Sequence, residues 1–387
     1  MKNGQRLKVA LVFDDTLDSN DGVAQYVKTL GAWLSHQGHD VSYLVGETKL
    51  ADWSGGKVYS LSKNIKVRFN GNKLSVPLPA SRRGIKRLLR EEKFDVLHIM
   101  APYSPFMASR VIKAASPKTA IVGTFHIFPS SRLSVLGSRV LYLVLRPSLK
   151  RFGKIVSVSP AAAQFAHDTY HIESQVVPNA VEIKRFLSKP KFDGRIKKIV
   201  FLGRLVERKG ASQLVDAFAL LLKSDPEARL VIAGDGPKRA ALEAKVSKLG
   251  IGKQVELLGY IDEIAKPQLL SEADIACFPS LYGESFGIVL IEAMAAGSRV
   301  ILAGDNPGYR SVLGQQPELL IDPRQTTRFA ERLHLLLSDQ DEIARLHEWQ
   351  QASVPQYDIG IVGTKLVSIY NGQIARLAKK SNNKAHG

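Results

Sequence analysis

The chain has 387 residues, of which 45% are hydrophobic and 23% charged, and this is the composition of a soluble globular protein long enough for two domains. It contains no run of about 18 uncharged apolar residues, and its first apolar stretch meets Asp14 and Asp15 too soon for a secretory leader, so we expect no membrane-spanning helix and no export. The single cysteine, Cys277, excludes an intrachain disulfide.

The net charge of +18 is concentrated in the first half of the chain. Residues 1–180 contain 25 Lys and Arg against 12 Asp and Glu. Nucleic acid and an anionic membrane would both attract such a surface. The basic stretches 81–93 and 146–154 offer only Phe152 for base stacking and match no nucleic-acid module, so we expect no nucleic-acid partner.

Strand and helix patterns alternate along the first half, which predicts an α/β domain with a parallel sheet. The expected strands are residues 7–13, 40–45, 94–100, 120–126 and 155–159, with a β-like stretch at 66–76 that turns at Asn70-Gly71. The expected helices are residues 23–37, 81–93, 109–116 and 133–152.

Two features of this half suggest ligand contacts. The loop between the first strand and its helix, residues 14–22, is too long for the Gly-x-Gly-x-x-Gly turn of a dinucleotide fold, and Gly22 is a candidate for close backbone approach. His126 stands at the carboxyl end of a strand, where open α/β sheets bind ligands. A polar residue satisfied within the fold is the alternative for His126.

The second half repeats the alternation after a hinge expected near residues 180–195. Its strands are predicted at residues 199–203, 230–234, 254–259, 273–278 and 299–303, and its helices at 212–222, 288–296 and 364–378, with a frayed end after residue 378. Residues 304–310 are expected to be a loop. Tyr260 and Ile261 directly follow a strand.

Two cations follow the strand at 199–203. Arg204 and Lys209 lie just beyond its carboxyl end and before a helix, where they could neutralise a diphosphate. Ordinary surface charge is the alternative from position alone.

The stretch from Pro279 to Gly297 leads from a buried strand through a tight loop into a helix that Gly297 should close. The first amides of that helix, those of Ser285, Phe286, Gly287 and Ile288, would be unpaired and could bind an anion. Glu284 in the loop and Glu292 in the helix could each reach hydroxyl groups beside that anion. A diphosphate flanked by two polyols, as in a nucleotide sugar, fits this layout, although each glutamate alone could be structural.

Several passages together resemble one family. They are Gly123-Thr-Phe-His126, Leu202-Gly-Arg204, Arg208-Lys-Gly210 and the run from Gly283 to Gly297 with its two glutamates eight residues apart. The chain resembles the retaining glycosyltransferases of the GT-B fold, family four, and is most similar to the phosphatidylinositol mannosyltransferases.

The resemblance implies two Rossmann-like, doubly wound parallel-sheet domains that face a cleft. The acceptor-binding domain would span residues 1–182 and the nucleotide-sugar domain 183–355, followed by a helix at 356–380 that crosses back and a tail at 381–387. GDP-mannose is the favoured donor, with UDP-sugars open, and the reaction would retain the anomeric configuration. We expect no cofactor and no metal, because no Asp-x-Asp stands at a strand end and Arg with Lys can replace a cation.

The resemblance also assigns roles to the candidate residues. Glu284 would face the donor sugar, Glu292 the ribose and His126 the acceptor side. Arg204 and Lys209 would hold the diphosphate, and Tyr260 and Ile261 would lie beside the base. The expected catalytic residues are Glu284, His126, Arg204 and Lys209, and Gly22 joins the donor site.

The helix at 81–93 is expected to dock on an anionic membrane from the cytoplasmic side of the plasma membrane. It groups Ile85, Leu88 and Leu89 on one face, and the cations around them are Arg82, Arg83, Lys86, Arg87 and Arg90. A surface helix that packs those apolar residues on the core is the alternative. A lipid acceptor would reach the enzyme there. A soluble-acceptor glycosyltransferase that uses a UDP-sugar and a nucleotide-sugar epimerase of the same fold remain alternatives, and the sequence leaves the oligomeric state open.

Overall fold

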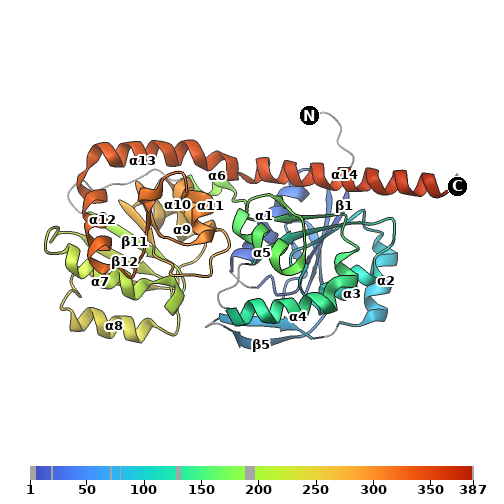
Figure 1. The fold of residues 1–387 in the computed structure, drawn as a ribbon, viewed down its shortest axis with the longest axis horizontal. Helices are drawn as coiled ribbons and strands as arrows, with labels where there is room; N and C mark the ends of the chain where they lie inside the picture. Colours follow the sequence, from blue (N-terminus) through green and yellow to red (C-terminus); the bar gives the residue numbers. More distant parts are fainter. Residues whose placement is uncertain are drawn as a thin grey trace. The chain divides into compact units, whose positions relative to one another are not determined.

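A computed structural model describes residues 6–18, 21–69, 72–78, 80–127, 132–187 and 197–385 of the chain. The chain forms two compact units (Figure 1), the first made of Met1–Ala180 with Ile359–Gly387 and the second of Val181–Asp358. Each unit is an α/β fold built on a mainly parallel sheet, as the alternating sequence pattern predicts.

The sheet of the first unit, among the described residues, has eight strands in the order β10-β9-β8-β7-β1-β2-β4-β3. All neighbours are parallel except β3 and β4. From β1 the chain adds β2 and β4 toward one edge of the sheet, and it then adds β7, β8, β9 and β10 on the other side of β1, toward the opposite edge. The direction in which strands are added therefore reverses between β1 and β7. The strands are β1 (Lys8–Phe13), β2 (Asp40–Val45), β3 (Asp52–Trp53), β4 (Gly56–Ser60), β7 (Val96–Ile99), β8 (Ala120–Phe125), β9 (Lys154–Ser157) and β10 (Gln175–Val176).

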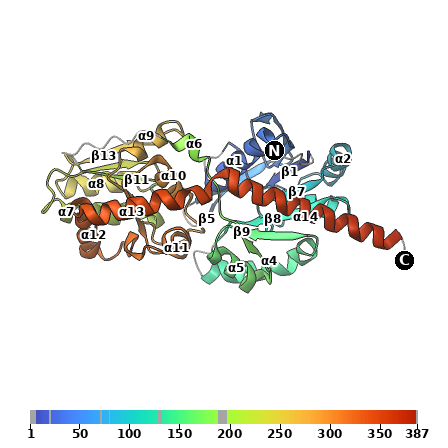
Figure 2. The same ribbon diagram turned by 90° about the horizontal axis from the view of Figure 1, so that it is seen from above.

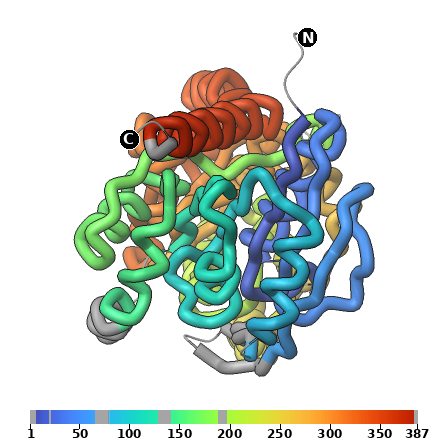
Figure 3. The backbone as a smooth tube through the Cα atoms, turned by 90° about the vertical axis from the view of Figure 1, so that its right-hand side faces the viewer, coloured from blue at the N-terminus to red at the C-terminus, as the bar shows by residue number. Residues whose placement is uncertain are grey.

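Helices cover both faces of this sheet. On one face α1 packs against the long last helix α14, which crosses β8 (Figure 2). Helices α2 to α5 follow one another across the other face, and Figure 3 shows them in teal and green apart from the red α14. These helices are α1 (Gly22–His36), α2 (Arg82–Glu92), α3 (Met107–Ala114), α4 (Arg132–Leu149), α5 (Pro160–Tyr170) and α14 (Ile359–Ala385).

A separate antiparallel hairpin, β5 (Asn64–Phe69) and β6 (Asn72–Pro77), stands apart from the main sheet. Phe69 pairs with Asn72, which leaves the two residues of the predicted Asn70-Gly71 turn between them; these two residues lie outside the described part of the chain.

The second unit contains six parallel strands in the described residues, in the order β13-β12-β11-β14-β15-β16. They are β11 (Lys198–Leu202), β12 (Arg229–Ala233), β13 (Val255–Gly259), β14 (Ile275–Phe278), β15 (Val300–Gly304) and β16 (Leu320–Ile321). The helices are α6 (Ile183–Phe186), α7 (Ala211–Leu221), α8 (Arg239–Lys248), α9 (Ala265–Ser271), α10 (Ile288–Ala296), α11 (Pro307–Leu313), α12 (Thr326–Ser338) and α13 (Gln340–Ser353), with short 3-10 turns at Glu207–Lys209, Pro317–Leu319 and Val354–Tyr357.

Two predicted segments differ from the structure. The last helix runs to Ala385, so most of the segment expected to fray, including residues 381–385 of the predicted tail, is helical; no glycine or proline between Gly372 and Gly387 would end it. Residues 304–310 are not all loop, because α11 begins at Pro307. Asn306 caps that helix by accepting a hydrogen bond from the Tyr309 amide at 3.0 Å.

Candidate active site

The sheet of the second unit has its winding reversal between β11 and β14. Strands added after β11 extend to one side, and those added after β14 extend to the other. Ligands of open α/β sheets bind outside the carboxyl ends of the strands at such a reversal. The segments that leave these two ends are Gly203–Gly210 and Pro279–Gly287, which contain most of the predicted donor-site residues.

The loop after β14 is fixed by close backbone contacts with three glycines. A Cβ atom on Gly210 would overlap the carbonyl oxygen of Pro279, and one on Gly304 or Gly308 would overlap the carbonyl oxygens of Ser280 and Glu284 respectively. Gly210 also has a φ of +72°, in the left-handed region. The backbone that carries Glu284 is therefore held tightly against its neighbours.

Glu284 is paired with two cations. Its Oε1 accepts hydrogen bonds from Nη1 of Arg208 at 2.7 Å and from Nζ of Lys209 at 2.8 Å. Its side chain is 13% exposed. Burial acts to raise the pKa of Glu284, but the charges of Lys209 and Arg208 and the hydrogen bonds to Lys209 and Ser280 hold that pKa below its ordinary value. The carboxylate is thus ionised at neutral pH.

The structure brings Lys209 directly to Glu284 and adds Arg208, which the sequence reasoning did not select. The sequence spacing does not single out Arg208. The side chains of Arg208 and Lys209 reach the same carboxylate because both residues lie in the 3-10 turn at Glu207–Lys209, and sequence spacing does not predict this turn. Arg204 lies exposed directly after β11, on the same segment.

The N-terminus of α10 follows the Glu284 loop. Gly287 is its N-cap residue, with a φ of 119°, and as a glycine it has no side chain that could cap the first turn. Phe286 is buried, whereas Ser285 and Ile288 are half-buried. The start of this helix therefore has the positive end of the helix dipole and first-turn amides that its N-cap residue does not cap, an arrangement that can bind a phosphate group. As predicted, Gly297 closes the helix with a left-handed φ of 82°.

Glu292 lies in α10 and is 7% exposed. Lys266 of α9 donates to its two carboxylate oxygens at 3.1 and 3.2 Å, and Glu263 pairs with the same ammonium at 2.9 Å. Burial raises the pKa of Glu292, and the charge of Lys266 opposes that rise. Lys266 is a second residue that sequence reasoning missed, because it comes from another helix.

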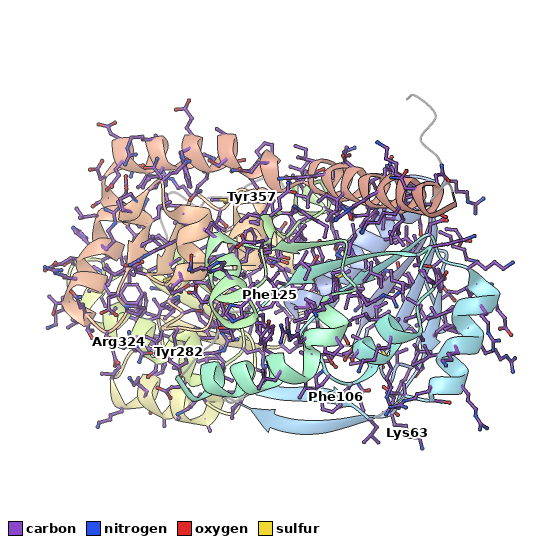
Figure 4. The ribbon with its side chains drawn as sticks, turned by 45° about the vertical axis from the view of Figure 1, so that its right-hand side comes forward. Lys63, Phe106, Phe125, Tyr282, Arg324 and Tyr357 are labelled. Carbon is purple, nitrogen blue, oxygen red and sulfur yellow. The ribbon has the colours of Figure 1, made fainter. Side chains whose placement is uncertain are left out.

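Tyr260 and Ile261 follow β13 directly, so they lie at the same edge of the parallel sheet as the segments after β11 and β14. Tyr260 is 64% exposed and Ile261 is half-buried. Tyr282, labelled in Figure 4, is an exposed aromatic residue of the Glu284 loop itself.

Two of the predicted site residues, Gly22 and His126, belong to the first unit. Gly22 is the first residue of α1, whose amides at Val23 and Ala24 are capped by the Asp21 carboxylate. His126 follows Phe125, the last residue of β8, which Figure 4 labels. His126 is buried, its Nε2 has no hydrogen-bond partner, and burial lowers its pKa to about 3. It is therefore a neutral imidazole whose Nε2 is buried and unpaired.

Helix α2 differs from the predicted membrane helix in one respect. Ile85 is 1% exposed and packs in the core between the sheet and helices α2 and α3, and Leu88 and Leu89 pack against the same core. The prediction that these three residues enter a bilayer is therefore wrong, because the fold already uses the apolar face. The predicted cations of this helix are all exposed, and Arg87 among them pairs with the exposed Glu91; they are Arg82, Arg83, Lys86, Arg87 and Arg90.

In the part of the chain that the structure describes, no helix is both long and apolar enough to span a bilayer. Within the same residues, no group of three or more His, Cys, Asp or Glu side chains is arranged to hold a metal ion.

Comparison with known proteins identifies the family. Residues 20–185 match the model for Glycosyltransferase Family 4, and residues 182–352 match that for Glycosyl transferases group 1. A phosphatidyl-myo-inositol mannosyltransferase of Mycolicibacterium smegmatis is 30% identical over 375 residues, which cover 94% of this chain and 93% of the relative. The chain belongs to the family 4 glycosyltransferases.

Solved structures agree with the fold of this glycosyltransferase. Sucrose-phosphate synthase of Thermosynechococcus elongatus aligns with a TM-score of 0.77 at 20% identity, over 96% of this chain and all of the other. The Anabaena protein HepE in complex with UDP-glucose aligns with a TM-score of 0.74 at 17% identity, over 94% and 99% of the two chains. The predicted GT-B fold is thereby confirmed.

Proposed function

We propose that this glycosyltransferase moves a mannosyl group from GDP-mannose to a phosphatidylinositol-type lipid at the cytoplasmic surface of the plasma membrane, with retention of the anomeric configuration. The observation that carries the proposal is the pairing of Glu284 with Arg208 and Lys209 just before the N-terminus of α10, whose N-cap residue is Gly287. The relative that matches 94% of the chain is named a phosphatidyl-myo-inositol mannosyltransferase, and its name supports the mannosyl group and the lipid.

The donor diphosphate would bind between the cations and the helix start. Lys has three N–H donors and Arg has five, so Lys209 and Arg208 can hold Glu284 and a phosphate at once. Arg204 adds a further charge at the same strand end. These groups would stabilise the negative charge that develops on the leaving phosphate as the sugar–phosphate bond breaks.

Glu284 would accept hydrogen bonds from hydroxyls of the donor sugar, and Glu292 from those of the ribose. The lowered pKa of Glu284 keeps its carboxylate ionised for this role. At Glu292 burial raises the pKa, and the ammonium of Lys266 is the charge that favours the ionised form. Retention would follow from attack on the same face of the sugar, with the leaving phosphate taking the proton of the acceptor hydroxyl. A neutral His126 would orient the acceptor through its unpaired Nε2.

The charge distribution supports a membrane-bound acceptor. The first unit holds 30 Lys and Arg against 12 Asp and Glu, a net charge of +18, whereas the second unit holds 24 of each. The exposed cations of α2 belong to the charged unit. An anionic bilayer would therefore attract the first unit and leave the second unit in solution.

Thermal unfolding with GDP-mannose, UDP-glucose and UDP-N-acetylglucosamine tests the donor. A tightly bound donor raises the unfolding temperature by mass action, and we expect GDP-mannose to give the largest rise. A larger rise with a UDP-sugar would favour the alternative of a UDP-sugar enzyme with a soluble acceptor. Conversion of the free sugar nucleotide without transfer would indicate the epimerase alternative.

We also propose that transfer needs no divalent cation, because Arg204, Arg208 and Lys209 supply the positive charge at the diphosphate. Full activity in EDTA is the expected result. Loss of activity in EDTA that magnesium or manganese restores would refute this part of the proposal.

A further inference from the structure

We propose that the exposed face of α4 is a hydrophobic membrane anchor, in which Leu143 and Val144 insert into an anionic bilayer. The proposal rests on the proposed function only in taking a lipid surface as the site of action. It names residues outside α2 and outside the candidate active site.

Leu143 and Val144 are 68% and 61% exposed, more than any other large apolar residues that the structure describes in the first unit. They are neighbours on α4. With Pro147, one turn later, they form a continuous apolar strip on the solvent side of this helix.

The orientation of this strip is fixed by the opposite side of α4. Leu145 is fully buried, and Ser148 is buried with its Oγ 2.9 Å from that of Ser109 on α3. Because α4 cannot rotate without breaking these contacts, Leu143 and Val144 stay in water unless a partner covers them. Two large exposed apolar side chains in adjacent positions mark a surface that binds something.

The surrounding charges indicate what that partner is. Arg146 and Lys150 are exposed beside the strip, and Arg151 follows them. From Val96 to His167 the sequence contains nine Lys and Arg and no Asp or Glu. A second copy of this face would be repelled. An apolar strip edged by cations suits a bilayer, in which the apolar residues meet acyl chains and the cations meet phosphate headgroups.

The strip on α4 offers the apolar contact with the bilayer that α2 lacks. The apolar residues of α2 pack inward, so α2 offers the membrane charge but no apolar contact. Both helices cover the same face of the sheet, and Phe106, which precedes α3 and is 39% exposed, is labelled near α4 in Figure 4. Charge on α2 and insertion from α4 would together hold that face on the lipid.

The chain allows a direct test, because its single cysteine, Cys277, is buried and should not react. Val144→Cys therefore places one accessible thiol on the strip for an environment-sensitive fluorophore. Ile361→Cys is the matched control, since Ile361 lies on α14 of the same unit and is 56% exposed.

With vesicles of phosphatidylcholine and phosphatidylinositol, the label at position 144 should shift to the blue and be quenched by lipids brominated in their acyl chains. The label at position 361 should not respond. Equal responses at the two positions, or none at position 144, would overturn the proposal.

A second measurement uses substitutions on the surface, where folding should not depend on them. Leu143→Ser with Val144→Ser should weaken partition into the same vesicles at least about a hundredfold, the size expected for removing two large apolar side chains from full burial in an apolar phase. Ile361→Ser should leave partition unchanged. Equal partition of the double variant and the unaltered protein would contradict the anchor.

The proposed function is checked separately with a water-soluble glycerophosphoinositol acceptor. The double variant should transfer sugar to this acceptor at the normal rate while its transfer to vesicle lipid falls in proportion to its partition, because only the second reaction needs the anchor. If the unaltered protein transfers to neither acceptor, the proposed function fails, and the partition measurement still decides the anchor.

Discussion

At the scale of residues, the proposed sugar transfer depends on the carboxylate of Glu284 and on Arg208 and Lys209, which pair with it. Glu284→Gln keeps the size of the side chain but removes its charge, so we expect transfer to fall at least about a hundredfold in kcat while the variant stays folded. Steady-state kinetics with circular dichroism on the same sample measures both. A folded variant with nearly normal turnover would remove Glu284 from the site.

Glu284→Ala should also lose stability. Truncation leaves Arg208 and Lys209 together without their counter-charge in a site where the three side chains are only 13–19% exposed, and we expect a cost of about 3 kcal/mol in the free energy of unfolding. The glutamine variant lacks the same counter-charge but keeps the side-chain volume, so urea denaturation of the two variants in parallel separates the cost of the lost charge, common to both, from that of the lost packing.

The two buried histidines, His98 and His126, should make the stability of the protein depend on pH. Burial lowers the pKa values of His98 and His126 to about 3, so both remain neutral in the fold, whereas they protonate near pH 6.5 when the chain unfolds. The unfolded state binds more protons below pH 6.5, and stability therefore falls as the pH drops from 6.5 toward 3. Asp14, whose pKa burial raises to about 6, acts in the opposite direction between about pH 6 and 4.

Urea denaturation at pH 7.0, 6.0 and 5.0 measures this loss of stability, and NMR of labelled histidine rings measures its cause. His98 and His126 should keep neutral-ring shifts at pH 5. His167 is the control, because its hydrogen bond with Asp168 raises its pKa and its side chain is 57% exposed, so it should be protonated there. Titration of His98 or His126 near pH 6.5 would show that they are not buried as described.

At the scale of elements, the close contacts of the glycines position the loop after β14. Gly210→Ala should destabilise the second unit and abolish the donor-induced rise in unfolding temperature, because the new methyl group would overlap the Pro279 carbonyl and the φ of +72° disfavours alanine. Gly252→Ala is the matched control, since it meets no atom within 4 Å. Similar behaviour of the two variants would mean that the loop tolerates displacement.

Sequence periodicity predicted most strands of both units, but of the helices only α1 to α4, α7, α10 and α14. Buried parallel strands and capped helices leave local signals, such as Pro279 after β14 and Gly297 after α10. Pairings between distant segments could not be predicted this way. Arg208 reaches a carboxylate 76 residues away, and Lys266 reaches one 26 residues away. The inward packing of Ile85 was equally inaccessible, because an amphipathic pattern is the same whether its apolar face meets a core or a bilayer.

At the scale of the whole molecule, the net charge is divided between the units, with +18 on the first and zero on the second. Neutralising the five exposed cations of α2 should greatly weaken salt-sensitive binding to anionic vesicles and leave the donor-induced thermal shift unchanged. Vesicle co-sedimentation at two salt concentrations measures the binding. The altered residues are Arg82, Arg83, Lys86, Arg87 and Arg90.

A matched control neutralises five exposed cations of the second unit, and it should bind vesicles normally. Its altered residues are Lys223, Lys248, Lys253, Arg324 and Arg328. Equal losses in the two variants would show that total charge, and not its place on the first unit, determines membrane binding.

The most direct test of the proposed function is transfer itself. The protein is incubated in EDTA with GDP-mannose and vesicles that contain phosphatidylinositol, and the lipid product is analysed by mass spectrometry and NMR. We predict a lipid heavier by one hexose with the same anomeric configuration as the donor sugar. An unmodified lipid, an inverted linkage, or a product formed only from a UDP-sugar would contradict the account.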